Sequence, residues 1–176
     1  MAAALTQMGP YRTGDGMQWP IVIKGRKGVD YDVHRVKVQT SSHLCIGLIA
    51  DFRAGYVDEV DYAAHGTNGL MAGIVIDSAW NKKRLQMSNS GAECTKALFF
   101  TAGDMIEIAM PRPGCIISVL ATTNEALEIN SKMEVGGAGI VKLWNDGTIV
   151  GRAKVYQTAG TGVFRIAMEW TATGAI

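Results

Sequence analysis

Short apolar runs separated by glycine-rich turns constrain this chain more than any other feature of its sequence. Between residues 103 and 170, runs of five to nine mostly aliphatic residues are interrupted by GGAG, NDG and TAGTG. The run VFRIAMEW (163–170) sends alternate side chains to opposite faces, which is the period-two pattern of a half-buried antiparallel strand. The pattern predicts a small β-barrel or sandwich in the last third of the chain.

Two of these turns predict β-hairpins. Asp146-Gly147 lies between IVKLW and TIVGRAKVYQ, and Asp-Gly is favoured in hairpins because the central residues of the turn adopt positive φ. Gly160-Thr161-Gly162 joins the second of these runs to the final one. GGAG (136–139) precedes a strand, whereas a dinucleotide-binding loop precedes a helix, so it is also interpreted as a turn.

The rest of the chain predicts further short strands. The candidates are the runs 19–24, 33–39, 43–50, 57–64, 70–77, 104–110 and 115–123. The runs 33–39 and 43–50 are expected to form a hairpin. Within 79–100, NKKRLQM suits a polar strand or a short helical turn, and a strand is favoured for ECTKALFF. We therefore expect an all-β fold of short antiparallel strands, with residues 19–176 forming a single barrel or sandwich domain.

The first 18 residues are small and polar, and their glycines and one proline oppose any regular element. They nevertheless carry Tyr11 and Arg12, and Trp19 follows directly. Two interpretations are open: a frayed terminus, or an extended N-terminal arm that becomes ordered against a neighbouring subunit. Tyr, Trp and Arg are the residue types that dominate interface hot spots, so these three are candidate contact residues.

A basic turn, Gly25-Arg26-Lys27-Gly28, follows the first predicted strand. No helix follows it, so it lacks the helix N-terminus that lets glycine-rich loops bind phosphate. A solvated turn is the first expectation, and contact of Arg26 and Lys27 with an acidic protein surface is the second.

Charge and cysteine content exclude several classes of protein. The 176 residues include 17 basic and 16 acidic side chains, without the basic excess typical of a nucleic-acid-binding protein. The three cysteines form no CxxC pair, which gives no support to a zinc site or a disulfide-stapled fold. No signal peptide and no apolar run long enough to cross a bilayer is recognised, so we expect a soluble protein made in the cytoplasm.

The sequence also predicts no enzyme. His34, His43 and His65 have no metal-ligand spacing on a plausible element, and Ser88-Asn89-Ser90-Gly91 lacks the context of a nucleophile elbow. No nucleophile, base and orienting group can be assembled, so we expect no cofactor, metal or small-molecule substrate. In TIVGRAKVYQ, Arg152 and Lys154 share a face with Val150 and Tyr156, a stripe typical of solvent, a subunit interface or a partner.

The C-terminal segments GDMIEIAM, SKMEVGGAGIVKLWNDG and IVGRAKVYQTAGTGVFRIAMEW resemble the head decoration, or cement, proteins of tailed phages. The matching segments are 133–141, 149–153 and 163–170, with LMAGIVID as a weaker echo, while residues 1–60 depart from the compact members of that family. The resemblance implies a β-barrel homotrimer on the outside of the capsid that clamps neighbouring major capsid proteins. Another virion component (tail, fibre or capsid protein) and a small-ligand-binding β-domain remain alternatives.

Overall fold

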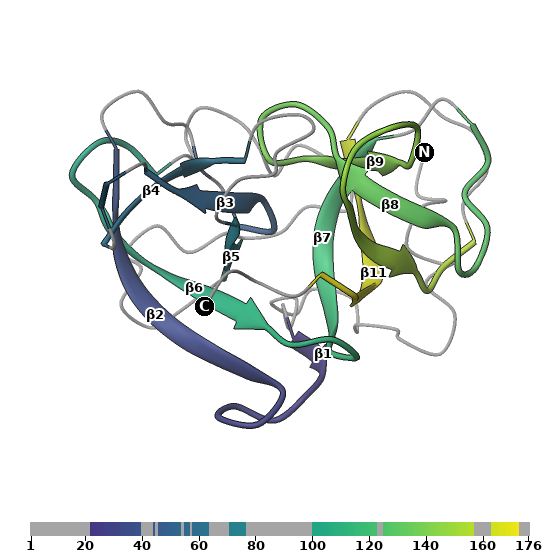
Figure 1. Cartoon of the computed structure of the whole chain (residues 1–176), viewed down its shortest axis with the longest axis horizontal. Helices are drawn as coiled ribbons and strands as arrows, with labels where there is room; N and C mark the ends of the chain where they lie inside the picture. Colours follow the sequence, from purple (N-terminus) through teal and green to yellow (C-terminus); the bar gives the residue numbers. More distant parts are fainter. Residues whose placement is uncertain are drawn as a thin grey trace.

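The computed structural model describes residues 22–39, 44, 46–53, 55–56, 58–63, 71–76, 100–122, 125–156 and 163–172. These residues form strands and no helix, which confirms the predicted all-β fold (Figure 1). The strands are β1 (Val22–Lys24), β2 (Tyr31–Val38), β3 (Ile49–Phe52), β4 (Glu59–Tyr62), β5 (Met71–Val75), β6 (Met105–Pro111), β7 (Ile116–Thr122), β8 (Lys132–Val135), β9 (Val141–Leu143), β10 (Ile149–Ala153) and β11 (Val163–Trp170).

Five strands close into a barrel, here called the first barrel, in the order β2-β4-β3-β5-β6. β2 and β6 form its longest antiparallel pair, while β2 and β4 are parallel, with Val38 opposite Val60. This barrel occupies the left half of the molecule in Figure 1. Along β2, Val36 and Val38 are buried while Arg35 and Lys37 are exposed, as expected for a strand with one face on a core.

The remaining strands form a second sheet in the order β1-β7-β11-β10-β8-β9. β7 and β9 also pair, in parallel, at Ala121 and Val141, so the strands β7-β11-β10-β8-β9 form a ring as well, here called the second barrel. β1 adds to the start of β7, where Lys24 lies opposite Ile116. β7 is buried along nearly its whole length and lies between the two barrels in Figure 1.

The two barrels have the same connectivity. In each, the first strand pairs antiparallel with the fifth and parallel with the third, and the second strand pairs antiparallel with the third and the fourth. The registers agree as well. In the first barrel Gly73 of β5 lies opposite Ala50, and in the second barrel Gly151 of β10 lies opposite Met133. In both barrels the strand register shifts directly beside this pair.

Backbone hydrogen bonds outside the ladders repeat between the barrels. The N–H of Trp144 donates to the carbonyl of Lys132, as the N–H of Ala63 does to that of Ile49. In the first barrel, Val75 accepts a hydrogen bond from the N–H of Gly47 and donates one to the carbonyl of Leu48. In the second barrel, Ala153 makes the same two bonds with Asn130 and Ser131. The bond from the N–H of Arg53 to the carbonyl of Glu59 likewise corresponds to the bond from Gly136 to Ile140. Asn130 has a positive φ of 70°, where the first barrel has Gly47 at 91°. The described chain is therefore two copies of one five-strand module.

Both barrels require a glycine at the same place. A Cβ at Gly73 would lie 2.2 Å from the carbonyl oxygen of Ala109, and one at Gly151 would lie 2.6 Å from that of Glu169. The fourth strand therefore approaches the fifth too closely for a side chain. Buried residues of both barrels belong to one continuous hydrophobic cluster. A single domain over 19–176 stays a prediction.

Two predicted hairpins are wrong. The run 33–39 does not pair with 43–50, because β2 lies between β4 and β6. The turn at Asp146-Gly147 joins β9 to β10, but β9 pairs with β8 and β7 instead. The predicted pairing of the last two runs is confirmed by β10 and β11, and 136–139 is the turn between β8 and β9.

Candidate contact surfaces

The predicted basic turn is an exposed loop between β1 and β2. The side chain of Arg26 is 81% exposed, and its backbone N–H donates a 2.7 Å hydrogen bond to Oδ2 of Asp30. Lys27 is also exposed. Gly28 at a φ of 79° has open space where a Cβ would lie. The loop thus presents two cations to solvent and holds no ligand cradle.

Arg112 fixes this loop to the connection between the barrels. Its guanidinium donates to the carbonyl of Val29 at 2.8 Å and to Oδ2 of Asp32 at 2.9 Å, and its backbone N–H donates to the carbonyl of Asp30 at 2.8 Å. Three anchors from one residue hold the loop in place although it is exposed. The cations of the loop are consequently presented on a defined surface.

A second candidate surface covers the outside of the second barrel. We call it the tryptophan face, and its members are Ile129, Asn130, Lys132, Trp144, Arg152, Lys154 and Tyr156. Trp144 is 44% exposed and Tyr156 48%, and the Lys132 ammonium lies 4.9 Å from the centre of the Trp144 ring. Of these residue types, Trp, Tyr and Arg are enriched at protein interfaces, whereas lysine is not.

The charged stripe predicted on this strand is present with one difference. Arg152 and Tyr156 are exposed and Lys154 is half-buried, but Val150 is buried because the register of β10 shifts between Ile149 and Gly151. Hydrogen bonds hold the stripe against Asn130: Arg152 donates to its carbonyl at 3.2 Å and Lys154 to its Oδ1 at 3.0 Å.

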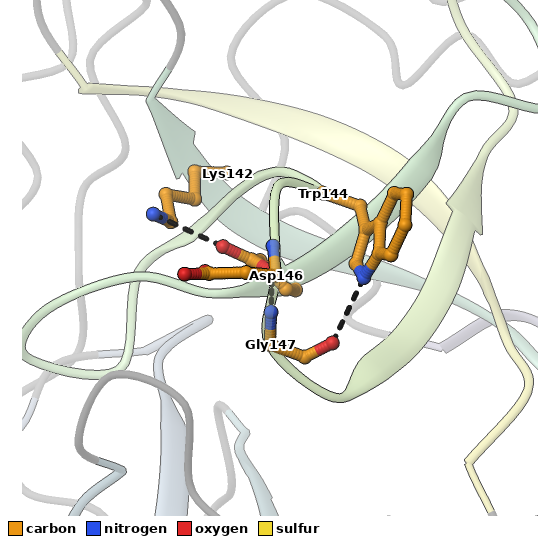
Figure 2. A network of polar contacts seen from close by, with 5 residues as sticks. Lys142, Trp144, Asp146 and Gly147 are labelled. Carbon is orange, nitrogen blue, oxygen red and sulfur yellow. Dashed lines mark hydrogen bonds and ion pairs between the residues drawn. The ribbon is translucent and has the colours of Figure 1, made fainter.

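Beneath the tryptophan face lies a buried carboxylate. Glu134 is fully buried, and its Oε1 pairs with Nζ of Lys142 at 3.0 Å. Its Oε2 accepts hydrogen bonds from the N–H groups of Gly147 at 2.6 Å and Asp146 at 3.3 Å, and the indole of Trp144 donates to the carbonyl of Gly147 at 2.8 Å (Figure 2). Burial acts to raise the pKa of Glu134, but the bonds from Lys142 and the backbone outweigh it, so the pKa is lowered.

This network positions the turn after β9 and does not create a reaction centre. Two backbone N–H groups and the Lys142 ammonium surround the carboxylate, and its lowered pKa keeps it ionised and unable to act as an acid near neutral pH. Its ligands are the same groups that shape the 144–147 turn. Glu134 therefore has a structural role: it holds Trp144 at the surface.

The other candidate chemical groups of the described residues are dispersed. Burial, followed by the charge of Asp30, raises the pKa of the Cys115 thiol to about 11. His34 is exposed on β2, and no group of three metal-binding side chains is found in the part of the chain that the structure describes. A hollow of about 250 Å³ beside Lys37, Arg53 and Glu59 is open and lined by paired charges. Within the same ranges, no helix is long and apolar enough to cross a membrane.

Several predicted residues lie outside the described ranges. They are the proposed arm 1–18 with Tyr11 and Arg12, and also Trp19, His43 and His65. Of the five predicted contact residues, the structure therefore places Arg26 and Lys27. The tryptophan face was only partly anticipated, through the stripe of Arg152 and Lys154.

The arrangement of strands is similar to that of a solved phage protein. No family model and no curated protein matches the sequence. Among solved structures, the N base of head fiber gp8.5 of bacteriophage phi29 aligns with a TM-score of 0.52 at 11% sequence identity. The alignment covers 83% of this chain and 98% of that one. At this identity the likeness concerns the fold.

Proposed function

We propose that this chain is a structural protein of a tailed-phage virion that attaches to the outside of the head as a decoration, or cement, protein. The observation that carries the proposal is the likeness to the base of a phage head fiber over 83% of the chain. The resemblance of residues 133–170 to decoration proteins supports the same class of role. The exposed cations and aromatic side chains are suited to contact rather than to chemistry.

In this proposal the partner is the major capsid protein, and a homotrimer made in the host cytoplasm clamps neighbouring capsid subunits. A standard protein interface buries about 1,600 Å² in total, and three chains acting together add avidity to individually modest contacts. Arg26 and Lys27 would meet acidic capsid side chains. Tyr11, Arg12 and Trp19 would extend the contact if residues 1–18 act as an arm.

The base of a head fiber is the second candidate. It is favoured by the solved structure that aligns with this chain, which is itself a head fiber base and is covered to 98% of its length. The two candidates share attachment to the head and differ in whether the attached protein carries a projecting fibre. Electron cryomicroscopy of decorated capsids separates them, because a fibre base has additional density extending away from the shell.

Co-sedimentation with capsids tests the proposal. Purified chain is mixed with phage heads that lack it and centrifuged through a sucrose cushion. We expect the wild-type chain in the pellet and the Arg26→Ala/Lys27→Ala double variant depleted about tenfold or more, because two charged contacts of about 1 kcal/mol each are lost. Lys37→Ala, an exposed cation on the first barrel, is the matched control. A wild-type chain that stays in the supernatant refutes head attachment.

Deletion of residues 1–18 tests the arm separately. The shortened chain should keep its β-sheet circular dichroism spectrum and attach to capsids more weakly than the full chain. Full retention on capsids would show that the arm has no role, while leaving attachment through Arg26 and Lys27 intact.

A further inference from the structure

The two barrels contact one another through a small hydrogen-bonded ring of three residues. The N–H of Ile49 donates to the carbonyl of Gly139 at 2.9 Å, the N–H of Gly139 to the carbonyl of Ala63 at 2.8 Å, and the N–H of Ala63 to the carbonyl of Ile49 at 2.9 Å. Ile49 and Ala63 belong to the first barrel, while Gly139 lies in the β8–β9 turn of the second. The backbone of Ile49 and Ala63, here called the first clasp, therefore holds both backbone polar groups of a glycine from the neighbouring barrel.

The turn held by the first clasp has a defined geometry. Ala138 and Gly139 have φ values of 55° and 74°, and the N–H of Ile140 donates to the carbonyl of Gly137 at 3.2 Å. Two consecutive residues of positive φ at the centre of a hydrogen-bonded four-residue turn are the arrangement of a type I′ turn. A Cβ at Gly139 would lie 2.4 Å from the carbonyl oxygen of Ile49, so the second central residue has to be glycine. The first central residue, Ala138, is exposed, and other side chains fit there.

The second barrel carries the same clasp. Lys132 occupies the register position of Ile49, and Trp144 that of Ala63. The N–H of Trp144 donates to the carbonyl of Lys132 at 2.9 Å. A hydrogen-bonded antiparallel pair normally exchanges two bonds, but the N–H of Lys132 and the carbonyl of Trp144 bond neither to each other nor to any other described residue. These are the donor and the acceptor that hold Gly139 in the first clasp, so Lys132 and Trp144 form a second clasp that is open on one side.

The second clasp is held in place by the network beneath it. Oε2 of Glu134 accepts the N–H of Gly147 at 2.6 Å, and the indole of Trp144 donates to the carbonyl of Gly147 at 2.8 Å (Figure 2). The ammonium of Lys132 lies 4.9 Å from the centre of the Trp144 ring. A site whose groups are already positioned loses little conformational freedom on binding, which favours association.

The charges around the second clasp favour an acidic partner. At the first clasp, the cross-strand pair is Ile49 and Ile74, and both side chains are fully buried. The equivalent pair in the second barrel is Lys132 and Arg152, which are both exposed. Neither of these cations forms an ion pair with a carboxylate in the described ranges. A turn with acidic side chains would complement them.

Apolar side chains beside the second clasp indicate that the partner is a protein. Six large hydrophobic residues are exposed within the described ranges, and three of them belong to the tryptophan face: Ile129, Trp144 and Tyr156. Ile129 is 60% exposed. Solvent contact explains the cations at this surface, but grouped exposed apolar side chains are typical of an interaction site.

The described part of a second copy does not supply a suitable turn. Among the described residues, Ala138 and Gly139 are the one pair of consecutive residues with positive φ, and they already occupy the first clasp. A type I′ turn needs positive φ at both central residues, so the occupant of the second clasp comes from a different chain.

We propose that the second clasp binds the type I′ hairpin turn of a different protein, with glycine at the second central position and aspartate at the first. Asp-Gly is among the pairs that such turns prefer, and its carboxylate is suited to Lys132 and Arg152. The turn glycine accepts a hydrogen bond from the N–H of Lys132 and donates one to the carbonyl of Trp144. The inference concerns this one docking surface and does not depend on a role in a virion.

Disulfide-closed hairpin peptides test the geometry of the occupant. One peptide has an Asp-Gly turn, and its matched control has Asp-Ala. Each is titrated into the isotope-labelled full chain, and NMR follows the backbone amide of Lys132 and the indole N–H of Trp144. We expect saturable shifts with Asp-Gly and binding weaker by about tenfold or more with Asp-Ala, because the methyl group enters the space that the glycine requires. No shifts with Asp-Gly, or equal binding of the two peptides, would overturn the proposal.

An Asn-Gly peptide tests the preference for an acid. It should bind more weakly than Asp-Gly at low ionic strength, and the difference should disappear at high salt, because exposed charges are then screened. Equal binding of the two peptides at low salt would show that the cations play no part in selecting the turn.

Two variants at one position test the backbone donor. Lys132→Ala and Lys132→Pro both remove the charge, but only proline removes the N–H at the first residue of β8, where proline is tolerated. We expect the Asp-Gly peptide to bind Lys132→Ala a few-fold more weakly than the wild type and Lys132→Pro not detectably. Equal binding by the two variants would contradict the clasp. If Lys132→Pro does not fold, the Asp-Gly and Asp-Ala peptides decide the question.

Sedimentation velocity separates a different protein from a second copy as the occupant. The wild type and Lys132→Pro should have the same oligomeric state, with or without the Asp-Gly peptide. Self-association that either the variant or the peptide abolishes would place a second copy on the clasp and overturn the proposal. The Arg26→Ala/Lys27→Ala double variant should bind the peptide like the wild type, so a failure of capsid attachment and a failure of this inference are distinguishable.

Discussion

Replacing Glu134 by glutamine tests the network that supports the tryptophan face. The substitution keeps the size of the side chain and one acceptor for the N–H of Gly147, but it removes the charge that pairs with Lys142 at 3.0 Å. Hydrogen bonds to a charged group contribute about 1.5–3 kcal/mol, and breaking a buried ion pair costs about 3–5 kcal/mol. Lys142 is 32% exposed and can turn to water, so the lower part of this range applies.

We therefore expect Glu134→Gln to lower the free energy of unfolding by about 2–3 kcal/mol. For a chain of this size, this corresponds to a decrease in Tm of about 4–12 °C. Urea unfolding followed by tryptophan fluorescence and calorimetry measures both quantities. The matched control is Glu169→Gln, which removes a partly exposed ion pair with Lys154 and should cost less than about 1 kcal/mol.

The same variant should change the dependence of stability on pH. The pKa of Glu134 is lower in the folded chain than its ordinary value of 4.5. Its stabilisation is therefore complete above the unfolded pKa and is lost as the pH falls through the folded pKa. Below pH 4.5 the wild type should lose its advantage over Glu134→Gln. A variant within 0.5 kcal/mol of the wild type at pH 7, or a constant difference down to the lowest pH at which both fold, would refute the role assigned to this carboxylate.

Three further outcomes are expected. Gly151→Ala should destabilise the chain by about 1–3 kcal/mol through overpacking against β11, whereas Gly137→Ala, with nothing within 4 Å of its Cβ, should change the urea midpoint little. Cys115 should react with a thiol reagent at pH 8 only on unfolding, because it is buried and its pKa is raised to about 11; rapid labelling of Cys115 itself in the folded protein, located by peptide mapping, would contradict this. Arg112→Ala should increase protease cleavage at the 25–30 loop and leave the midpoint within about 1 kcal/mol, since its pair with Asp32 is exposed.

Period-two patterning identified the strands of this chain better than it identified their partners. The final run matches β11, and the runs 33–39 and 104–110 match β2 and β6 to within a few residues. Two of the three predicted hairpins failed because pairing depends on which strand edges are free. The Asp146-Gly147 turn has the residues of a hairpin, but the carboxylate of Glu134 takes its N–H groups, and both edges of β9 are occupied by β8 and β7.

The repetition of the module is hidden in the sequence by its connections. Val36 of the first barrel corresponds to Val119 of the second, a separation of 83 residues, whereas Ile106 corresponds to Ile166, a separation of 60. No constant period exists, since the connection before the fifth strand differs in length. Both β6 and β11 contain the tripeptide IAM, but aligning these tripeptides would be misleading. The strand pairings make Ile108 of β6 equivalent to Met168 of β11, two residues beyond the isoleucine of the second tripeptide.

Corresponding positions of the two barrels diverge according to the direction in which they point. Positions that face the interior stay small or aliphatic and buried, as Val36 and Val119 do. Positions that face outward change character. Lys37 of the first barrel is 50% exposed, whereas the corresponding Leu120 of the second barrel is fully buried. Leu120 lies at the junction of the barrels, where its N–H donates to the carbonyl of Gly47. A repeated module needs the same interior in each copy, while each exterior adapts to its neighbour. The exterior differences therefore follow from whether each barrel has a neighbour within the chain: the first barrel is apolar where it meets the second, and the corresponding positions of the second barrel are the exposed polar and aromatic residues of the tryptophan face.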